Sequence, residues 1–148
     1  MPNVAQTISR AMEASYKAYN DFAALQSEIA LRQTSLKDKP EAKELLEELA
    51  KLERNANDLG EGSDEAPGIG PMNRDLSRYF VMVESADIRP VASAQKVSHE
   101  LSVALQQRLA AWQKLNDENV PALNTKLEAM HLAGLPVARA EKYLAATR

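Results

Sequence analysis

The chain has 148 residues, no cysteine and a formal net charge of −3, from 18 Lys and Arg against 21 Asp and Glu. This length is typical of one domain and is sufficient to bury a hydrophobic core without crosslinks. The missing cysteines exclude disulfides and thiolate metal sites. The two charge signs are interleaved without a basic stripe, which does not favour a nucleic-acid binder. No apolar run reaches the roughly 18 residues that a membrane helix requires.

Aromatic residues make up only 5% of the chain, whereas Ala, Leu, Glu, Gln and Lys are abundant. This composition favours helices over strands. Residues 1–10 lack the basic start and apolar stretch of a signal peptide. We therefore expect the chain either to act where it is made or to be a piece of a longer exported protein, which leaves its compartment undetermined.

The first predicted helix spans Val4–Leu36. Its apolar residues recur at steps of three and four, which places them on one stripe of a helix. No Gly or Pro occurs in residues 3–37, so nothing interrupts the pattern. The stripe consists of Val4, Ile8, Met12, Tyr19, Phe22, Leu25 and Ile29.

The second predicted helix begins at Pro40, a residue that suits the first helical position, and continues to about Leu59. Asp38 stands where a side chain can accept hydrogen bonds from the first amides. Gly60 is predicted to end the helix as a C-cap. Residues 62–71 form the one long polar stretch rich in Gly and Pro, so we expect a flexible loop that crosses one end of a bundle.

The third predicted helix covers residues 72–86, with Asn73 near its start as a candidate cap. Residues 87–90 form a tight connection, because Asp87 and Pro90 favour a turn. A fourth helix follows Pro90, with an apolar seam that continues to Leu115.

Pro121 interrupts the last helix, because a proline removes one backbone hydrogen bond and clashes with the preceding turn. The helix either kinks there or restarts with Asn119 as its cap. The apolar face continues to Gly134, and the run Gly134-Leu135-Pro136 is predicted to stop it. We hypothesise that the Asn124 side chain satisfies the carbonyl group that Pro121 leaves without its usual donor.

Four main helices with short links predict an all-α fold, an up-down four-helix bundle with a Pro-kinked or broken last helix. The bundle is predicted to span residues 1–136. Residues 137–148 are predicted to form a short C-terminal tail, either helical or frayed. No internal repeat or low-complexity segment divides the chain.

One spacing suggests metal chemistry. Glu128 and His131 are three residues apart and share a helix face, and di-iron carboxylate bundles use two such pairs with two further glutamates. The other histidine, His99, has Lys96 three residues before it, so the second pair is missing. The run Ser98-His99-Glu100 contains residue types of a catalytic triad. Consecutive helical side chains diverge by about 100°, however, so these three do not converge.

The glycines at positions 60, 62, 68 and 70 precede a helix, as in phosphate-binding loops. Their spacing matches neither glycine-rich phosphate motif, and the loop has no lysine. Glu61, Asp64 and Glu65 offer oxygen ligands for calcium but lack the ligand order of an EF-hand. We therefore predict no catalytic, cofactor-binding or metal-binding residue, and no enzyme.

The aromatic residues at helical spacing are interpreted as core. They are Tyr16, Tyr19, Phe22, Tyr79, Phe80 and Trp112. The alternative function is a small-molecule or metal-binding helical carrier, which requires a real cavity. Its pocket would be lined by Tyr16, Tyr19, Phe80, Trp112 and His131. The acidic cluster is interpreted as a solvated face. It comprises Glu41, Glu44, Glu47 and Glu48.

A family resemblance rests on short motifs from Arg74 to Pro136 and on the glycines just before them. The motifs are Gly68-Ile69-Gly70, Asn73-Arg74-Asp75-Leu76, Ala86-Asp87-Ile88-Arg89-Pro90, Leu109, Trp112, Leu115, Val120-Pro121-Ala122-Leu123-Asn124 and Gly134-Leu135-Pro136. In order and spacing they resemble the C-terminal helical domain of bacterial sortilin-like, BNR-repeat β-propeller proteins, often labelled glycosyl hydrolases. The resemblance implies an all-helical accessory domain beside a propeller. It transfers no catalytic residue, because any hydrolytic site would belong to the propeller.

The predicted function is therefore a non-enzymatic helical-bundle accessory or protein-interaction domain. Its expected partner is another protein or an adjacent β-propeller domain, not a nucleic acid or a membrane. The expected contact surface is one open bundle face or the loop at residues 62–71. Long helices with heptad-like seams also dimerise, so we expect a monomer with a dimer as the alternative.

Overall fold

The computed structural model, which describes residues 4–85 and 92–138, is an all-α helical bundle, as predicted. Its elements are α1 (Val4–Leu36), the 3-10 turn η1 (Pro40–Ala42), α2 (Lys43–Gly60), α3 (Ile69–Ser85), α4 (Ala92–Lys114), the π-helical turn η2 (Leu115–Asn119) and α5 (Val120–Ala129). The bounds of α1 are those predicted. A non-helical segment, residues 132–138, follows α5. The predicted connection at residues 87–90 and the end of the tail lie outside the described residues.

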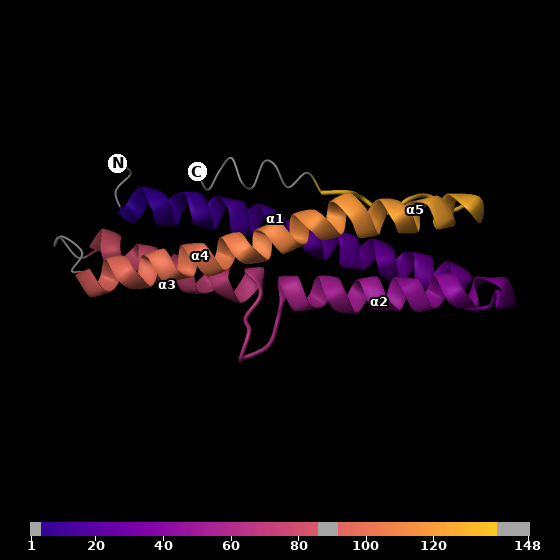
Figure 1. The fold of residues 1–148 in the computed structure, drawn as a ribbon, viewed down its shortest axis with the longest axis horizontal. Helices are drawn as coiled ribbons and strands as arrows, with labels where there is room; N and C mark the ends of the chain where they lie inside the picture. Colours follow the sequence, from indigo (N-terminus) through magenta and orange to yellow (C-terminus); the bar gives the residue numbers. More distant parts are fainter. Residues whose placement is uncertain (1–3, 86–91, 139–148) are drawn as a thin grey trace.

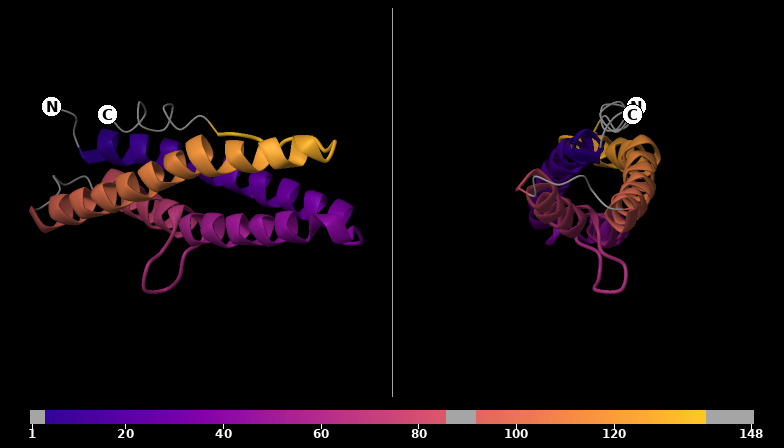
Figure 2. Two further views of the ribbon diagram at one scale, coloured as in Figure 1. Left: turned by 45° about the vertical axis from the view of Figure 1, so that its right-hand side comes forward. Right: turned by 90° about the vertical axis from the view of Figure 1, so that its left-hand side faces the viewer.

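The helices form three rods around one core. α1 runs along the molecule, and α4, η2 and α5 form a second continuous rod (Figure 1). α2 and α3 lie end to end on the third side and run in the same direction (Figures 1 and 2). The predicted reversal of direction between the second and third helices is therefore absent. The loop between them brings the chain back to the end of α2, and α3 continues along the axis of α2.

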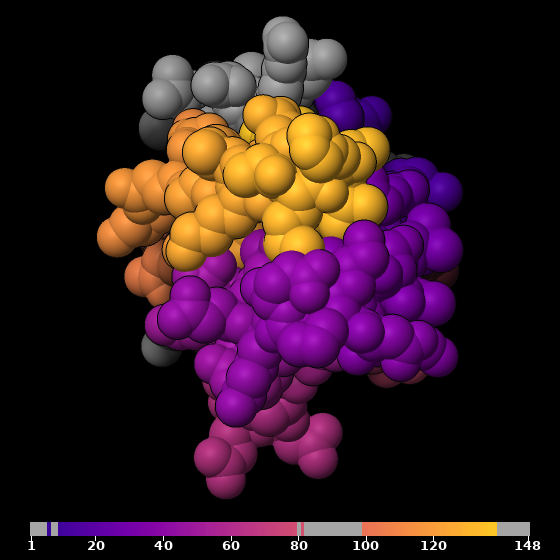
Figure 3. Space-filling model, turned by 90° about the vertical axis from the view of Figure 1, so that its right-hand side faces the viewer, coloured from indigo at the N-terminus to yellow at the C-terminus, as the bar shows by residue number. Residues whose placement is uncertain are grey.

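The loop between α2 and α3 leaves the body and comes back at the same place. Its two ends meet in a short antiparallel bridge between Gly62 and Pro67. The Gly68 amide also donates to the Glu61 carbonyl at 3.0 Å. The loop projects sideways from the body, halfway along the molecule, so the prediction that it crosses one end is wrong (Figures 1 and 3).

Glycines allow α2 and α3 to meet α1 closely at this junction. A Cβ on Gly60 would lie 2.6 Å from ring atoms of Phe22, and one on Gly70 would lie 2.5 Å from the Tyr19 ring. Gly60 is the last residue of α2 and is buried, so it is not the C-cap that was predicted. Gly62, at φ 70°, takes the left-handed conformation that ends the helix.

The core is continuous along the three rods, with Trp112 fully buried in it. The Trp112 ring meets Phe22 edge to face at 6.3 Å between centroids, and Phe22 in turn contacts Tyr19 at 5.6 Å. Edge-to-face and tilted pairs are the favoured geometries of aromatic rings. The other large side chains that are fully buried are Leu25, Ile29, Leu36, Leu49, Ile69, Leu76, Leu105, Leu109 and Leu127.

The last rod stays continuous past Pro121 because one turn widens. In η2 the Val120 amide donates to the Leu115 carbonyl, five residues back, where an α-helix spans four. Asn119 keeps helical dihedral angles and makes no side-chain cap bond, so the helix does not restart there. Of the two predicted alternatives, the restart at Asn119 is therefore wrong, and the helix passes Pro121 through a π turn.

α5 ends at Ala129, before the predicted stop at Gly134. The Leu132 amide donates to the Leu127 carbonyl and the His131 amide to the Glu128 carbonyl, at 3.0 and 2.9 Å. This pair of bonds defines a Schellman motif, in which one residue takes the left-handed conformation. Here that residue is His131, at φ 60°.

Two predicted helix caps are also wrong. α3 begins at Ile69, so Asn73 lies inside it, and the Asn73 side chain donates to Met12 O and Ser15 Oγ on α1. At the start of the second helix, the cap residue is Lys39 and not the predicted Asp38, and no side chain caps the turn. Pro40 takes the first position there, as predicted, but in the 3-10 turn η1.

Candidate interaction site

The residues considered for metal binding or catalysis are spread over the surface. Glu128 and His131 are exposed at the end of α5, and His99 and Glu100 are exposed on α4. The side chain of Ser98 lies outside the described set. Within the described residues, no group of three His, Asp or Glu side chains could hold a metal ion.

The residues of the carrier alternative are brought together only in part. Tyr16 is 64% exposed, whereas Trp112 is fully buried. The 17 positions from Trp112 to the end of α5 at Ala129 correspond to about 26 Å of helix, and His131 follows that end. The side chain of Phe80 lies outside the described set. Tyr16 and Tyr19 line one small open pocket of about 260 Å³, but Trp112 and His131 are not part of it.

The acidic residues near the loop have separate roles. Asp64 and Glu65 are exposed at the loop tip, whereas the Glu61 carboxylate accepts a hydrogen bond from the Tyr19 hydroxyl. That hydrogen bond, together with burial and the negative charge of Glu61, raises the pKa of Tyr19 above its ordinary value of 10.0. Of the acidic cluster on η1 and α2, Glu41, Glu44 and Glu47 are exposed, and Glu48 pairs with Lys126.

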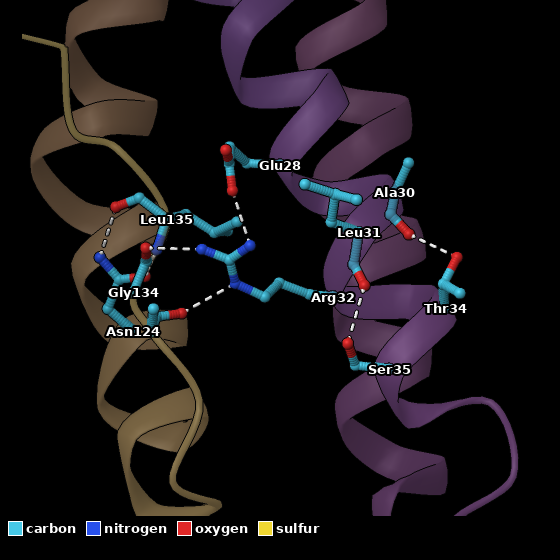
Figure 4. A network of polar contacts seen from close by, with 10 residues as sticks. Glu28, Ala30, Leu31, Arg32, Thr34, Ser35, Asn124, Gly134 and Leu135 are labelled. Atoms are coloured by element: carbon cyan, nitrogen blue, oxygen red, sulfur yellow. Dashed lines mark hydrogen bonds and ion pairs between the residues drawn. The ribbon is translucent and has the colours of Figure 1, made fainter.

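The most developed polar arrangement holds the segment after α5, which we call the strap (residues 132–138). Arg32 reaches from α1 to the strap, where its Nε donates to Ala133 O at 2.8 Å and its Nη2 to Gly134 O at 3.0 Å (Figure 4). Its Nη1 pairs with Glu28 at 2.6 Å. The Arg32 side chain is only 13% exposed, so these three acceptors compensate a largely desolvated charge.

Two asparagines hold the strap from the other rod. Asn124 on α5 donates to Leu135 O at 3.0 Å and accepts from the Leu135 amide at 2.6 Å. The hypothesis that Asn124 serves the carbonyl near Pro121 is therefore wrong. Asn116, buried in η2, accepts from the Ala138 amide at 2.9 Å and donates to Trp112 O. We call Arg32, Asn116 and Asn124 the clamp.

Two strap residues fit the clamp by size. Leu135 is buried, at 3% exposure, and is the apolar anchor of the segment. A Cβ on Gly134 would lie 3.1 Å from the Asn124 amide carbon, which is tighter than ordinary contact. Sequence reasoning assigned Gly134 and Leu135 to a helix stop and missed the clamp. The one available signal was the presence of three polar residues, Arg32, Asn116 and Asn124, next to apolar stripes.

A second feature is an open groove of about 810 Å³ between α1 and α2. Its lining comprises Phe22, Ala23, Gln26 and Ala30 of α1 together with Glu53, Arg54, Asn55, Asn57, Asp58 and Glu61. Gln26 donates to Glu53 O at 3.2 Å, and its buried Oε1 has no hydrogen-bond partner among the described residues. The groove is thus nearly uncharged on the α1 side and acidic on the α2 side.

None of the described helices combines the length and apolar character needed to cross a bilayer. Comparison of the chain with protein-family models, with curated proteins and with solved structures finds no match.

Proposed function

We propose that this chain is a non-enzymatic helical module that binds a protein partner, as an accessory domain in or beside a β-propeller protein. The observation that supports this function best is the exposed face of α1. After Lys17, the exposed positions of α1 carry no charged residue. They are Asn20, Ala23, Ala24, Ser27, Ala30, Leu31, Thr34 and Ser35.

An uncharged exposed helix face is unusual, because the solvent side of an amphipathic helix normally carries charges. The exposed positions of α2 follow that rule, with Lys43, Glu44, Glu47, Lys51 and Arg54 among them. Covering charged side chains requires their desolvation, and the centres of protein interfaces are depleted in charge for that reason. The α1 face can be covered without this cost, and Leu31, 58% exposed, supplies apolar area.

The groove beside this face specifies the partner further. Small residues on α1 let another helix approach closely, since the distance between packed helices depends on the side chains at the contact. On the α2 side, Glu53 and Asp58 outweigh Arg54, so that side of the groove is acidic. We therefore expect the occupant to be a partner helix with small residues facing α1 and a Lys or Arg facing α2.

The test uses the absence of cysteine, which makes a single introduced thiol unique. Ala30→Cys places a photocrosslinker in the groove, and Glu47→Cys places it on an exposed α2 position outside the groove. Crosslinking in a lysate of the source cells should identify one protein from position 30 and not from position 47. Binding of that purified protein should fall at least about tenfold in Ala23→Glu, which introduces a charge to be desolvated. Equal crosslinking at both positions, or unchanged binding by Ala23→Glu, would contradict the proposed surface.

The accessory-domain part of the proposal has a separate test. The coding sequence around this chain should contain β-propeller repeats in the same reading frame or in the adjacent gene. Isolated propeller protein should then bind the chain in solution. A coding region without such repeats would contradict the accessory role and leave the α1–α2 groove to an unrelated partner.

A further inference from the structure

The clamp recognises the strap through its main chain. Two hydrogen bonds from Arg32, two with Asn124 and one with Asn116 join the clamp to the strap. All five end on backbone N–H or C=O groups of residues 133–138, as in sites that bind peptides by their backbone. Such bonds do not depend on the identity of the peptide side chains.

Two positions of the bound segment do depend on side chains. A Cβ at position 134 would lie 3.1 Å from the Asn124 amide carbon, so glycine fits there with less crowding than any other residue. It also requires an apolar side chain at position 135, where Leu135 is almost fully buried. The clamp is therefore shaped for a non-helical peptide that contains glycine followed by leucine.

We propose that the clamp is a peptide-binding site that takes the Gly134-Leu135 segment of a second copy of this chain as well as its own. The second copy carries a peptide of the required shape, and identical elements exchange between copies at low cost. The hinge for the exchange is His131, whose left-handed backbone turns the strap back along α5. Opening this turn would let the strap project beyond α5 toward another molecule. The α1–α2 groove takes no part in this exchange.

The contacts are the same whether the strap comes from its own chain or from a second copy, so concentration decides between them. A segment tethered by a short hinge has an effective concentration on the order of millimolar. At micromolar concentration the chain therefore keeps its own strap. Binding of the strap of a second copy can be detected once competition from the chain's own strap is removed.

Two complementary variants remove it. The clamp variant, Arg32→Ala with Asn124→Ala, retains an intact strap that its own chain binds weakly. The strap variant, Leu135→Asp, retains an intact clamp with a defective strap. Native mass spectrometry of an equimolar mixture, at about 20 μM and thus far below the effective concentration of the tether, should show a 1:1 complex of twice the chain mass of 16.3 kDa. Each variant alone should remain single, and the mixed pair should associate at least about tenfold more tightly than wild type with itself.

Three controls keep the test decisive. Circular dichroism of each variant must show a cooperative melt, and Gly134→Val replaces Leu135→Asp if the latter does not fold. Thr125→Ala, an exposed neighbour of the clamp, paired with the strap variant should give no complex, because both clamp and strap are intact in that chain. A synthetic peptide of residues 132–138 should dissociate the mixed pair. A mixture of folded variants that stays single, or a complex that resists the peptide, would overturn the proposal.

Discussion

Asn124 uses both hydrogen-bonding groups of its side chain on one residue, Leu135. Replacing it with Ala leaves the Leu135 amide and carbonyl without these partners next to a buried leucine. Each lost hydrogen bond typically costs about 0.5–1.5 kcal/mol, so Asn124→Ala should lower the free energy of unfolding by about 1–3 kcal/mol. Urea unfolding followed by circular dichroism measures this change. Thr125→Ala, one position on and exposed, is the control and should change stability by less than about 0.5 kcal/mol. An equal effect of the two changes would contradict the role of Asn124.

His131 is the one described non-glycine residue with positive φ. A left-handed backbone costs an L-residue about 1–2 kcal/mol, because Cβ approaches the carbonyl oxygen, and glycine avoids this cost. Part of the gain is offset by the greater freedom of glycine in the unfolded chain. His131→Gly should therefore raise the melting temperature by about 2–3 °C for a domain of this size. His131→Ala keeps Cβ and should melt close to wild type. A decrease with Gly would show that the imidazole itself stabilises the helix end.

Tyr19 links protonation to stability. Its pKa is raised in the folded protein, chiefly by the hydrogen bond to Glu61, so the folded state keeps the phenolic proton to higher pH than the unfolded chain. The resulting stabilisation is complete below the unfolded pKa of 10.0 and is lost as pH rises through the raised folded value. Tyr19→Phe should cost about 1–2 kcal/mol at pH 7, and its difference from wild type should shrink above about pH 10. Chemical unfolding at several pH values tests this, and a difference that stays constant or grows would refute the link.

At the scale of the elements, helix propensity and packing predict opposite changes in stability for a substitution of Gly60. Glycine inside a helix is normally worse than alanine by about 1 kcal/mol, so propensity alone predicts that Gly60→Ala stabilises. The new methyl group would lie 2.6 Å from the buried Phe22 ring, and overpacking typically costs about 1–3 kcal/mol. We expect packing to win and Gly60→Ala to unfold at lower urea concentration than wild type. Asn57→Ala, exposed on the same helix, should be neutral or slightly stabilising.

The elements also show how much of the fold can be predicted from the sequence. The apolar stripe and the unbroken run without Gly or Pro predict α1 with its observed bounds. The same local rules fail at Gly60 and Asn73, because contacts with α1 decide their roles and those contacts lie 38 or more positions away in the chain. The clamp was missed for the same reason. Arg32 binds residues about 100 positions away, and the strap has no periodic pattern to reveal it.

At the scale of the whole molecule, two rods run uninterrupted past the junction of α2 and α3 (Figure 1). α1 packs against both α2 and α3, so neither half of the molecule has a core of its own. Unfolding should therefore be a single cooperative transition, as expected for a small domain. Trp112, the sole tryptophan, is buried against Phe22 on α1. Its fluorescence and the helical circular dichroism signal should give the same urea midpoint. Separate midpoints would mean that one half melts before the other.

The two irregular places in the rods differ in how they tolerate a change of chain length. The loop at residues 61–68 is pinched at its base, so residues added at its exposed tip leave the direction of α3 unchanged. The π turn η2 has no such freedom. It already holds one residue more than an α turn, and each residue advances a helix by about 100°, so one further inserted residue would rotate α5 and carry Leu123, Leu127 and Asn124 away from the core and the strap. Insertions in related chains should therefore accumulate in the loop and be excluded from residues 115–119, although both places interrupt regular α-helix.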